Sequence, residues 1–154
     1  MTSIQRRAPG RSASSNGGTV LVIGNYRPAL AAAPALRKMG YRVVLGAEPG
    51  STGAERSRFV DEIWPLPAPE SGPAAFRAAL ASRIRSDETV TAVLPMTERF
   101  LNLVDASRDI VPDPIMIVAP QSRVLGICHD KLAWLRFCRT IGVACPPFEA
   151  ASTL

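Results

Sequence analysis

Short apolar runs alternate along the chain with segments of helical periodicity. Residues 19–24 (TVLVIG), 41–46 (YRVVLG) and 90–95 (VTAVLP) are short and rich in β-branched residues. Such runs are typical of strands that are buried on both faces of a parallel sheet. Shorter runs at 61–66 and 114–118 predict two further strands, and Pro65 is expected to limit the length of the first.

The segments between these runs favour helices. Phe76, Leu80 and Ile84 recur every four residues, which predicts a helix over 73–85. Pro28 suits the first turn of a helix over 29–39, whereas Pro34 is expected to kink that helix or delay its start. Further helices are predicted at 54–59, 97–106 (with Thr97 as the N-cap) and 122–128.

A last helix is predicted to begin after Asp130, which is a good N-cap, and to end at Gly142. Trp134, Phe137, Cys138 and Ile141 fall on one face of it, at i, i+3, i+4 and i+7. We therefore expect this stripe to be core.

Alternating strands and helices predict an α/β fold, a Rossmann-like three-layer domain with a mostly parallel sheet of about five strands. Ligands of such sheets bind at the carboxyl ends of the strands, near a switch in strand order. The loop after Gly24, the loop after Leu94 and the turn into the last helix are therefore the places where a site is expected.

Composition narrows the class of protein. The 154 residues are 47% hydrophobic and 20% charged, and no apolar run reaches the roughly 18 residues of a membrane helix. The net charge of +5 comes largely from Arg6, Arg7 and Arg11 in a Ser- and Gly-rich segment, 1–18, that is expected to be a disordered leader. The other basic residues are scattered, which disfavours a nucleic-acid partner. One His and three widely spaced Cys give no zinc pattern, and we expect buried free thiols in a cytoplasmic protein.

The first loop, Gly24-Asn25-Tyr26-Arg27, lacks the G-x-G-x-x-G pattern of dinucleotide folds. The absence of this pattern disfavours a nicotinamide or flavin enzyme. Glu48 lies at the position of a ribose-binding acid, but without the glycines it receives little weight as a cofactor-binding residue. Arg27 beside a helix N-terminus can hold an anion or can be a solvated surface residue.

Two further charged residues lie at the other expected places. Glu98 follows a buried strand, where it can bind a substrate amine, orient Arg27 or stabilise the first turn of a helix. Lys131 stands in the first turn of the last helix, where the helix dipole disfavours a cation. An anionic ligand such as a phosphate would account for that placement, and exposure to solvent is the alternative.

Three segments together resemble the N-terminal, pre-ATP-grasp domain of the ATP-grasp ligases, the superfamily of biotin carboxylase and the carbamoyl-phosphate synthase large chain. They are the strand, helix and strand over 20–46, the segment Ala92-Val-Leu-Pro-Met-Thr-Glu98, and the Asp130-Lys131 helix followed by Gly142-Val-Ala-Cys-Pro-Pro147. The resemblance covers residues 19 to 148.

The resemblance implies a domain over 19–142 and the start of a missing ATP-grasp domain over 143–154. It implies that Lys131 contacts ATP and that Asn25, Tyr26, Arg27, Thr97 and Glu98 face a small carboxylate or amine substrate. Members of the superfamily activate a carboxylate as an acyl phosphate with Mg-ATP and pass it to an amine or another nucleophile. ATP and Mg²⁺ are thus the cofactors of the parent protein, and no catalytic or metal-binding residue is assigned to this chain.

The glycine-rich lid and the metal ligands of the ATP-grasp fold are absent from these 154 residues. We therefore expect the chain to be a fragment that is inactive alone and that docks to missing C-terminal domains through Val143, Pro146, Pro147 and Phe148. The alternative is a Rossmann-like module that binds a small molecule without ATP chemistry. A homodimer is left open in either case.

Overall fold

The structure is a computed structural model that describes residues 17–50 and 53–149. Contacts divide these residues into two compact units, one that ends at Ala119 and one that begins at Pro120. The domain predicted over 19–142 stays a prediction. In the second unit, the last two helices contact each other.

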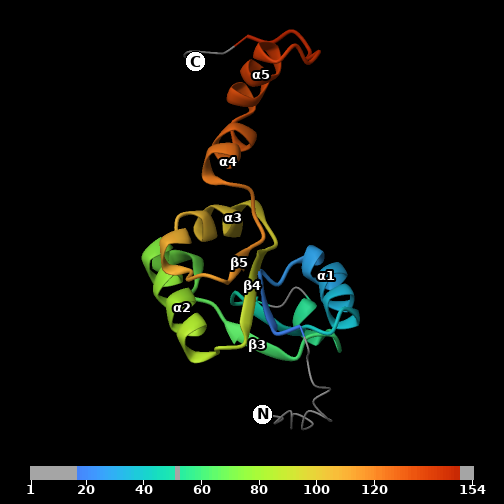
Figure 1. Ribbon diagram of the computed structural model, residues 1–154, viewed down its shortest axis with the longest axis vertical. Coiled ribbons are helices and arrows are strands. Elements are labelled where there is room, and N and C mark those ends of the chain that lie inside the picture. The colour runs from blue at the N-terminus through green and yellow to red at the C-terminus, as the bar shows by residue number, and fades with distance from the viewer. Residues whose placement is uncertain (1–16, 51–52, 150–154) are drawn as a thin grey trace. The chain divides into compact units, whose positions relative to one another are not determined.

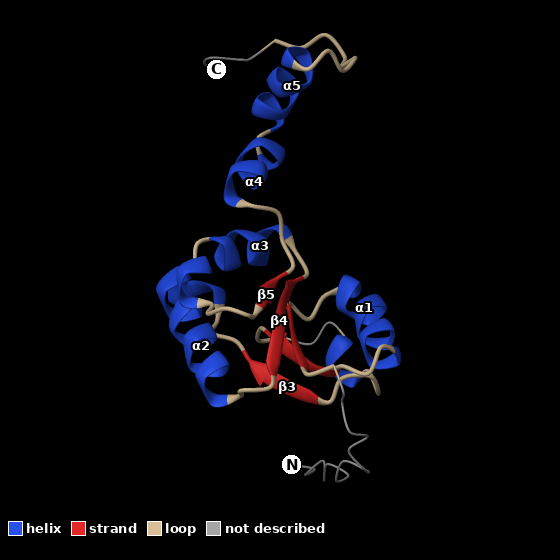
Figure 2. Cartoon of the chain, in the orientation of Figure 1, coloured by secondary structure: helices blue, strands red, loops and turns tan. Residues whose placement is uncertain are grey.

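The first unit contains a five-stranded sheet in the order β3-β2-β1-β4-β5. All four strand pairs are parallel. Figure 2 shows the strands in red. Its elements are β1 (Thr19–Ile23), α1 (Arg27–Lys38), β2 (Arg42–Ala47), η1 (Ala54–Arg56), β3 (Glu62–Pro65), η2 (Pro69–Ser71), α2 (Gly72–Ser86), β4 (Val90–Pro95), α3 (Glu98–Asp105), η3 (Arg108–Ile110) and β5 (Met116–Ile117).

The sheet separates two layers of helix (Figure 1), and alternate residues of each central strand face opposite layers. Leu21 and Ile23 of β1 belong to one buried cluster, with Phe76 and Leu80 of α2 and with α3. Val20 and Val22 belong to the other, which includes Ala29 and Ala33 of α1. The apolar runs are therefore buried on both faces, and the predicted Rossmann-like fold is confirmed.

Several predicted elements change in detail. Pro34 lies inside a continuous α1, so it neither delays the start of the helix nor ends it. Because Ala29 and Ala33 are packed against the sheet, tertiary contacts can offset the hydrogen bond that Pro34 removes. The helix predicted over 54–59 is limited to the 3-10 turn η1, and β5 has only two residues.

An ion-pair network joins the beginnings of the strands. We call Arg42, Glu62, Arg83 and Asp87 the amino-end network. Nη1 of Arg42 lies 2.9 Å from Oδ2 of Asp87, and Arg42 also pairs with Glu62. Arg83 of α2 lies 2.5 Å from Glu62 and 3.0 Å from Asp87. The network therefore fixes the end of α2 to β2 and β3.

The surroundings of Asp87 shift the pKa of its carboxyl. Burial alone would raise the pKa of its carboxyl. Hydrogen bonds from Thr89 and the charges of Arg42 and Arg83 outweigh burial, and the pKa is lowered. Asp87 is therefore ionised over the whole neutral range, where its pairs contribute to stability.

The second unit contains α4 (Ser122–His129) and α5 (Lys131–Thr140). The N-cap is confirmed, because Oδ1 of Asp130 accepts hydrogen bonds from the backbone N–H groups of Leu132 and Ala133 at 2.8 and 3.0 Å. The predicted core stripe is corrected, since Cys138 is buried whereas Trp134, Phe137 and Ile141 are exposed. The two helices offer too little apolar surface to cover the whole stripe.

All three cysteines are free, as predicted, but only Cys138 is buried, and Cys128 is exposed. Within 17–50 and 53–149, no helix has the length and apolar character needed to cross a membrane. The predicted leader lies outside the described residues, apart from Gly17 and Gly18.

Candidate functional site

The order of the strands places the candidate site between β1 and β4. The chain leaves β1 for β2 on one side and leaves β4 for β5 on the other, so the order switches between these two neighbours. The loops at their carboxyl ends diverge at such a point and leave room for a ligand. Gly24 to Tyr26 follow β1, and Met96 and Thr97 follow β4.

Asn25 is almost fully buried and connects the loops after β1 and β2. Its amide nitrogen donates to the backbone oxygen of Gly50 at 3.1 Å and to the carboxylate of Glu55. Its amide oxygen accepts a hydrogen bond from the backbone N–H of Glu48 at 3.3 Å. The polar atoms of Asn25 are thus used within the protein, which shapes the site.

Glu48 is the charged centre of this edge of the sheet. It follows β2 and is 7% exposed. The hydroxyl of Tyr26 donates to its Oε2 at 3.0 Å, and the guanidinium of Arg99 pairs with its Oε1. We call Asn25, Tyr26, Glu48 and Arg99 the carboxyl-end cluster. Two donors, one of them charged, compensate the burial of this carboxylate.

The pKa of Tyr26 reflects its contact with Glu48. Its hydrogen bond to the Glu48 carboxylate raises the pKa of the phenol, because loss of the proton would bring two negative charges together. Burial and the charge of Glu48 act in the same direction, and Arg99 acts against them. Tyr26 therefore remains a hydrogen-bond donor at neutral pH.

The other predicted substrate-binding residues, Arg27, Thr97 and Glu98, lie at the same edge of the sheet. Oγ1 of Thr97 accepts a hydrogen bond from the backbone N–H of Phe100 at 3.4 Å, so the predicted N-cap of α3 is confirmed. Arg27 and Glu98 begin α1 and α3 and are exposed. Between 17 and 149, apart from the two undescribed positions, no ion pair joins Glu98 to Arg27. The pair that forms is Glu48 with Arg99.

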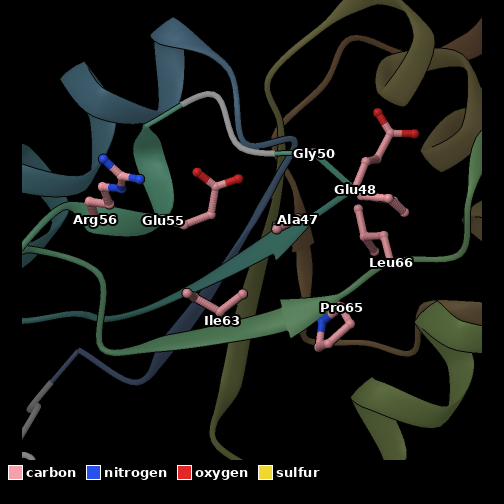
Figure 3. Close-up of a pocket in the computed structure, with 9 residues that line it drawn as sticks. Ala47, Glu48, Gly50, Glu55, Arg56, Ile63, Pro65 and Leu66 are labelled. Atoms are coloured by element: carbon pink, nitrogen blue, oxygen red, sulfur yellow. The ribbon is translucent and has the colours of Figure 1, made fainter. Parts of the chain in front are cut away.

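Two cavities adjoin the Glu48–Arg99 ion pair. The first has a volume of about 460 Å³ and contains Glu48 (Figure 3). Its apolar residues come from β2, β3 and the residue after β3, and Glu55 and Arg56 of η1 supply further charge. Its lining is Ala47, Glu48, Pro49, Gly50, Glu55, Arg56, Ile63, Pro65 and Leu66.

The second cavity has a volume of about 580 Å³ and contains Arg99. Its lining is Pro73, Glu98, Arg99, Asn102, Leu103 and Ala106. Glu48 thus lines one cavity, and its ion-pair partner Arg99 lines the other. Both volumes lie within the range of small-molecule sites.

Lys131 belongs to the second unit, where it is the exposed first residue of α5. Among the described residues, no group of three or more His, Cys, Asp and Glu side chains could hold a metal ion. The part of the chain that the structure describes therefore does not fit a Mg²⁺ site.

Sequence reasoning missed Arg99 and gave Glu48 too little weight. Glu48 carried a usable signal, since it is an acid directly after a buried strand, at the edge where sites form. The absence of the glycine pattern of dinucleotide folds argues only against a ribose-binding role for this acid. Arg99 carried no local signal, because its partner lies 51 residues earlier.

No family model and no curated protein sequence matches the chain. Its fold is similar to that of a biotin carboxylase domain of a single-chain bacterial carboxylase, with a TM-score of 0.64, 23% identity, and coverage of 89% of this chain and 32% of that chain. It is also similar to N5-carboxyaminoimidazole ribonucleotide synthetase from Thermotoga maritima, with a TM-score of 0.60, 17% identity, and coverage of 89% and 34%. The pyruvate carboxylase of Rhizobium etli gives a TM-score of 0.59 and 17% identity, over 82% of this chain and 12% of that chain.

The chain thus spans about a third or less of the length of each of these three structures. At these identities the likeness concerns the fold. The predicted resemblance is thus confirmed as a likeness of fold to parts of several carboxylases and a synthetase.

Proposed function

We propose that the chain acts as the N-terminal, substrate-side domain of an ATP-dependent carboxylate–amine ligase of the ATP-grasp superfamily. The observation that supports this most directly is the carboxyl-end cluster, which places paired opposite charges beside two cavities in a fold shared with carboxylases. A ligase of this kind needs a cation to hold a carboxylate and an acid to hold an amine.

The charged residues at the carboxyl ends of the strands divide between these two tasks. Arg27 and Arg99 supply cations, and Glu98 supplies an accessible acid. Glu48 holds Arg99, and Tyr26 donates to Glu48, so these two residues position the guanidinium. Thr97 fixes the start of α3, which carries both Glu98 and Arg99.

ATP and Mg²⁺ would be bound mainly by residues outside this chain. Lys131 is the residue proposed to contact a phosphate of ATP, because a cation in the first turn of a helix is unfavourable without an anion. The acyl phosphate would form on the bound carboxylate once ATP is present. The described residues carry no cluster for Mg²⁺, and they are assigned no step that involves the metal.

The first experiment is to read the gene beyond codon 154 and to express the whole reading frame. The proposal expects an open frame with acidic metal ligands, and ADP formation that depends on a carboxylate and an amine together. Lys131→Ala is expected to weaken ATP binding about tenfold, the effect of one charge-assisted contact.

Lys38→Ala is the matched control, because Lys38 is the other lysine of the chain and ends α1. Equal ATP affinity in the two variants would remove Lys131 from the site. A complete reading frame that forms no ADP with any carboxylate–amine pair would overturn the ligase proposal.

One observation favours the second candidate, a module that binds a small molecule without turnover. Every residue that lines the two cavities belongs to the first unit, so the described residues build them without another domain. A stop after codon 154, with ligand binding that ATP does not change, would favour the module over the ligase. Cytoplasmic location and a homodimer remain predictions under either function.

A further inference from the structure

The cavity that contains Arg99 is lined by groups of opposite charge on one helix face. Glu98, Arg99, Asn102, Leu103 and Ala106 follow at helical spacing along α3 and its C-cap, so they share a face. Pro73, in the first turn of α2, completes the lining. The face therefore has an acid, a base and an amide at one end and apolar groups toward the other.

Much of the hydrogen-bonding capacity on this face is unused. Within the described residues, the side chains of Glu98 and Asn102 have no hydrogen-bond partner. Arg99 uses Nη1 for Glu48, which leaves the N–H groups of Nη2 and Nε. Because Glu48 is buried and holds one arm of the guanidinium, the other donors are presented in a restricted orientation.

Contacts between α2 and α3 hold the cavity in shape. Nη1 of Arg77, one turn after Pro73, donates to the backbone oxygen of Ala106 at 3.4 Å. The same guanidinium pairs with Asp109 at 2.5 Å. The rings of Phe76 and Phe100 lie 6.0 Å apart beneath these helices. A ligand would therefore meet a preformed surface.

We propose that this cavity binds an α-amino acid with an aliphatic side chain. Arg99 takes the carboxylate, Glu98 takes the ammonium group, and Leu103, Ala106 and Pro73 take the side chain. A ligand with only a carboxylate would be repelled by the like charge of Glu98. A ligand with only an ammonium group would be repelled by the like charge of Arg99. A zwitterion satisfies both residues at once.

The site deepens the proposed function, because it names the class of the amine substrate and rests on that function for its role in a reaction. The binding itself is independent of ATP. We would titrate the ¹⁵N-labelled full chain with L-leucine and follow backbone amide shifts by NMR. Saturable shifts are expected over residues 98–106. The two analogues L-leucinamide and 4-methylpentanoate, each lacking one charge, should bind at least about tenfold more weakly.

Glu98→Gln is expected to weaken the binding of L-leucine about tenfold. Glu88→Gln is the matched control, because Glu88 is also exposed and lies at the opposite end of β4. The control should bind like the natural chain. Equal binding of leucine and leucinamide, equal effects of the two substitutions, or no shifts at millimolar L-leucine would overturn the proposal.

The two proposals fail in different ways. Amino-acid binding by a protein that forms no ADP would contradict the ligase proposal and support the amino-acid site. ADP formation by a protein that does not bind L-leucine would support the ligase proposal and contradict the amino-acid site.

Discussion

The two ends of the sheet use ion pairs in different ways. In the amino-end network, two arginines and two acids pair with one another, and every side chain is at most 35% exposed. In the carboxyl-end cluster, the acid is buried but its partner Arg99 is 45% exposed. Beside it, Arg27 and Glu98 are exposed at the starts of two helices.

Under the proposed function, the charges at the amino end serve the fold and those at the carboxyl end serve ligand binding. The amino-end network joins α2, β2 and β3, so its charges satisfy each other and hold elements together. The carboxyl-end cluster pairs the buried acid with Arg99, which stays partly exposed and lines a cavity. Stability should therefore depend mainly on the first region, and ligand affinity on the second.

Arg83→Leu should cause the largest loss of stability. Its side chain is 14% exposed and pairs with both Glu62 and Asp87, so its removal leaves two partly buried acids with less compensation. We expect a loss of about 3 kcal/mol in the free energy of unfolding, measured in urea. Arg85→Leu on the same helix is the control, and since Arg85 is exposed its effect should stay below about 0.5 kcal/mol. Similar losses in the two variants would contradict the structural role of the network.

Glu48→Gln should reduce stability less than Arg83→Leu does, and it should clearly change the pKa of Tyr26. The substitution keeps the shape and an acceptor, and Arg99 can be solvated, so a loss of about 1 to 2 kcal/mol is expected. The pKa of Tyr26 should fall toward its ordinary value, because the carboxylate that raises it is gone.

Absorbance titration in a Tyr41→Phe background isolates this tyrosine, because the chain has two. Glu88→Gln in the same background should leave the titration unchanged. An unaltered pKa in the Glu48→Gln variant would remove the contact between Tyr26 and Glu48.

The contribution of Asp87 should depend on pH. Its pKa is lowered in the folded state, so its stabilisation is fully present above the ordinary carboxyl pKa. That stabilisation is lost as the pH falls through the lowered folded value. Asp87→Asn should therefore cost about 1 kcal/mol at neutral pH and progressively less in acid, measured by urea unfolding at a series of pH values. A cost that does not change between neutral and acid pH would contradict the ionised role of Asp87.

Arg27→Gln should have the smallest effect on stability. Arg27 is exposed at the start of α1, where the dipole slightly disfavours a cation, so the free energy of unfolding should change by less than about 0.5 kcal/mol. Thermal unfolding without ligand checks this expectation. A loss above about 1 kcal/mol would show that Arg27 serves the fold, as Arg83 does.

Local features were predictable because their causes lie within a few residues. The strand over 90–95 has the predicted bounds, and Thr97 and Asp130 cap the helices that follow them, since a cap needs only an acceptor and the next N–H groups. The apolar runs specified strands buried on both faces, which requires a parallel sheet with helices on each side.

Effects that depend on packing against segments far apart in the chain were not predictable. Pro34 is tolerated in α1 because alanines of that helix lie on the sheet, and the stripe of α5 is exposed because its own unit cannot cover it. Neither outcome can be read from spacing alone, because spacing gives the face of a helix but not what covers it.

The sequence by itself determined most elements, their order and the edge of the sheet where the candidate site lies. Only the tertiary structure decided which charges meet there. The strand order puts β1 between β2 and β4, so Glu48 after β2 and Arg99 after β4 lie at the same edge, where they pair although they are far apart in the chain. Periodicity and capping are local properties, whereas strand order is set by the burial of the whole sheet, and the site depends on that order.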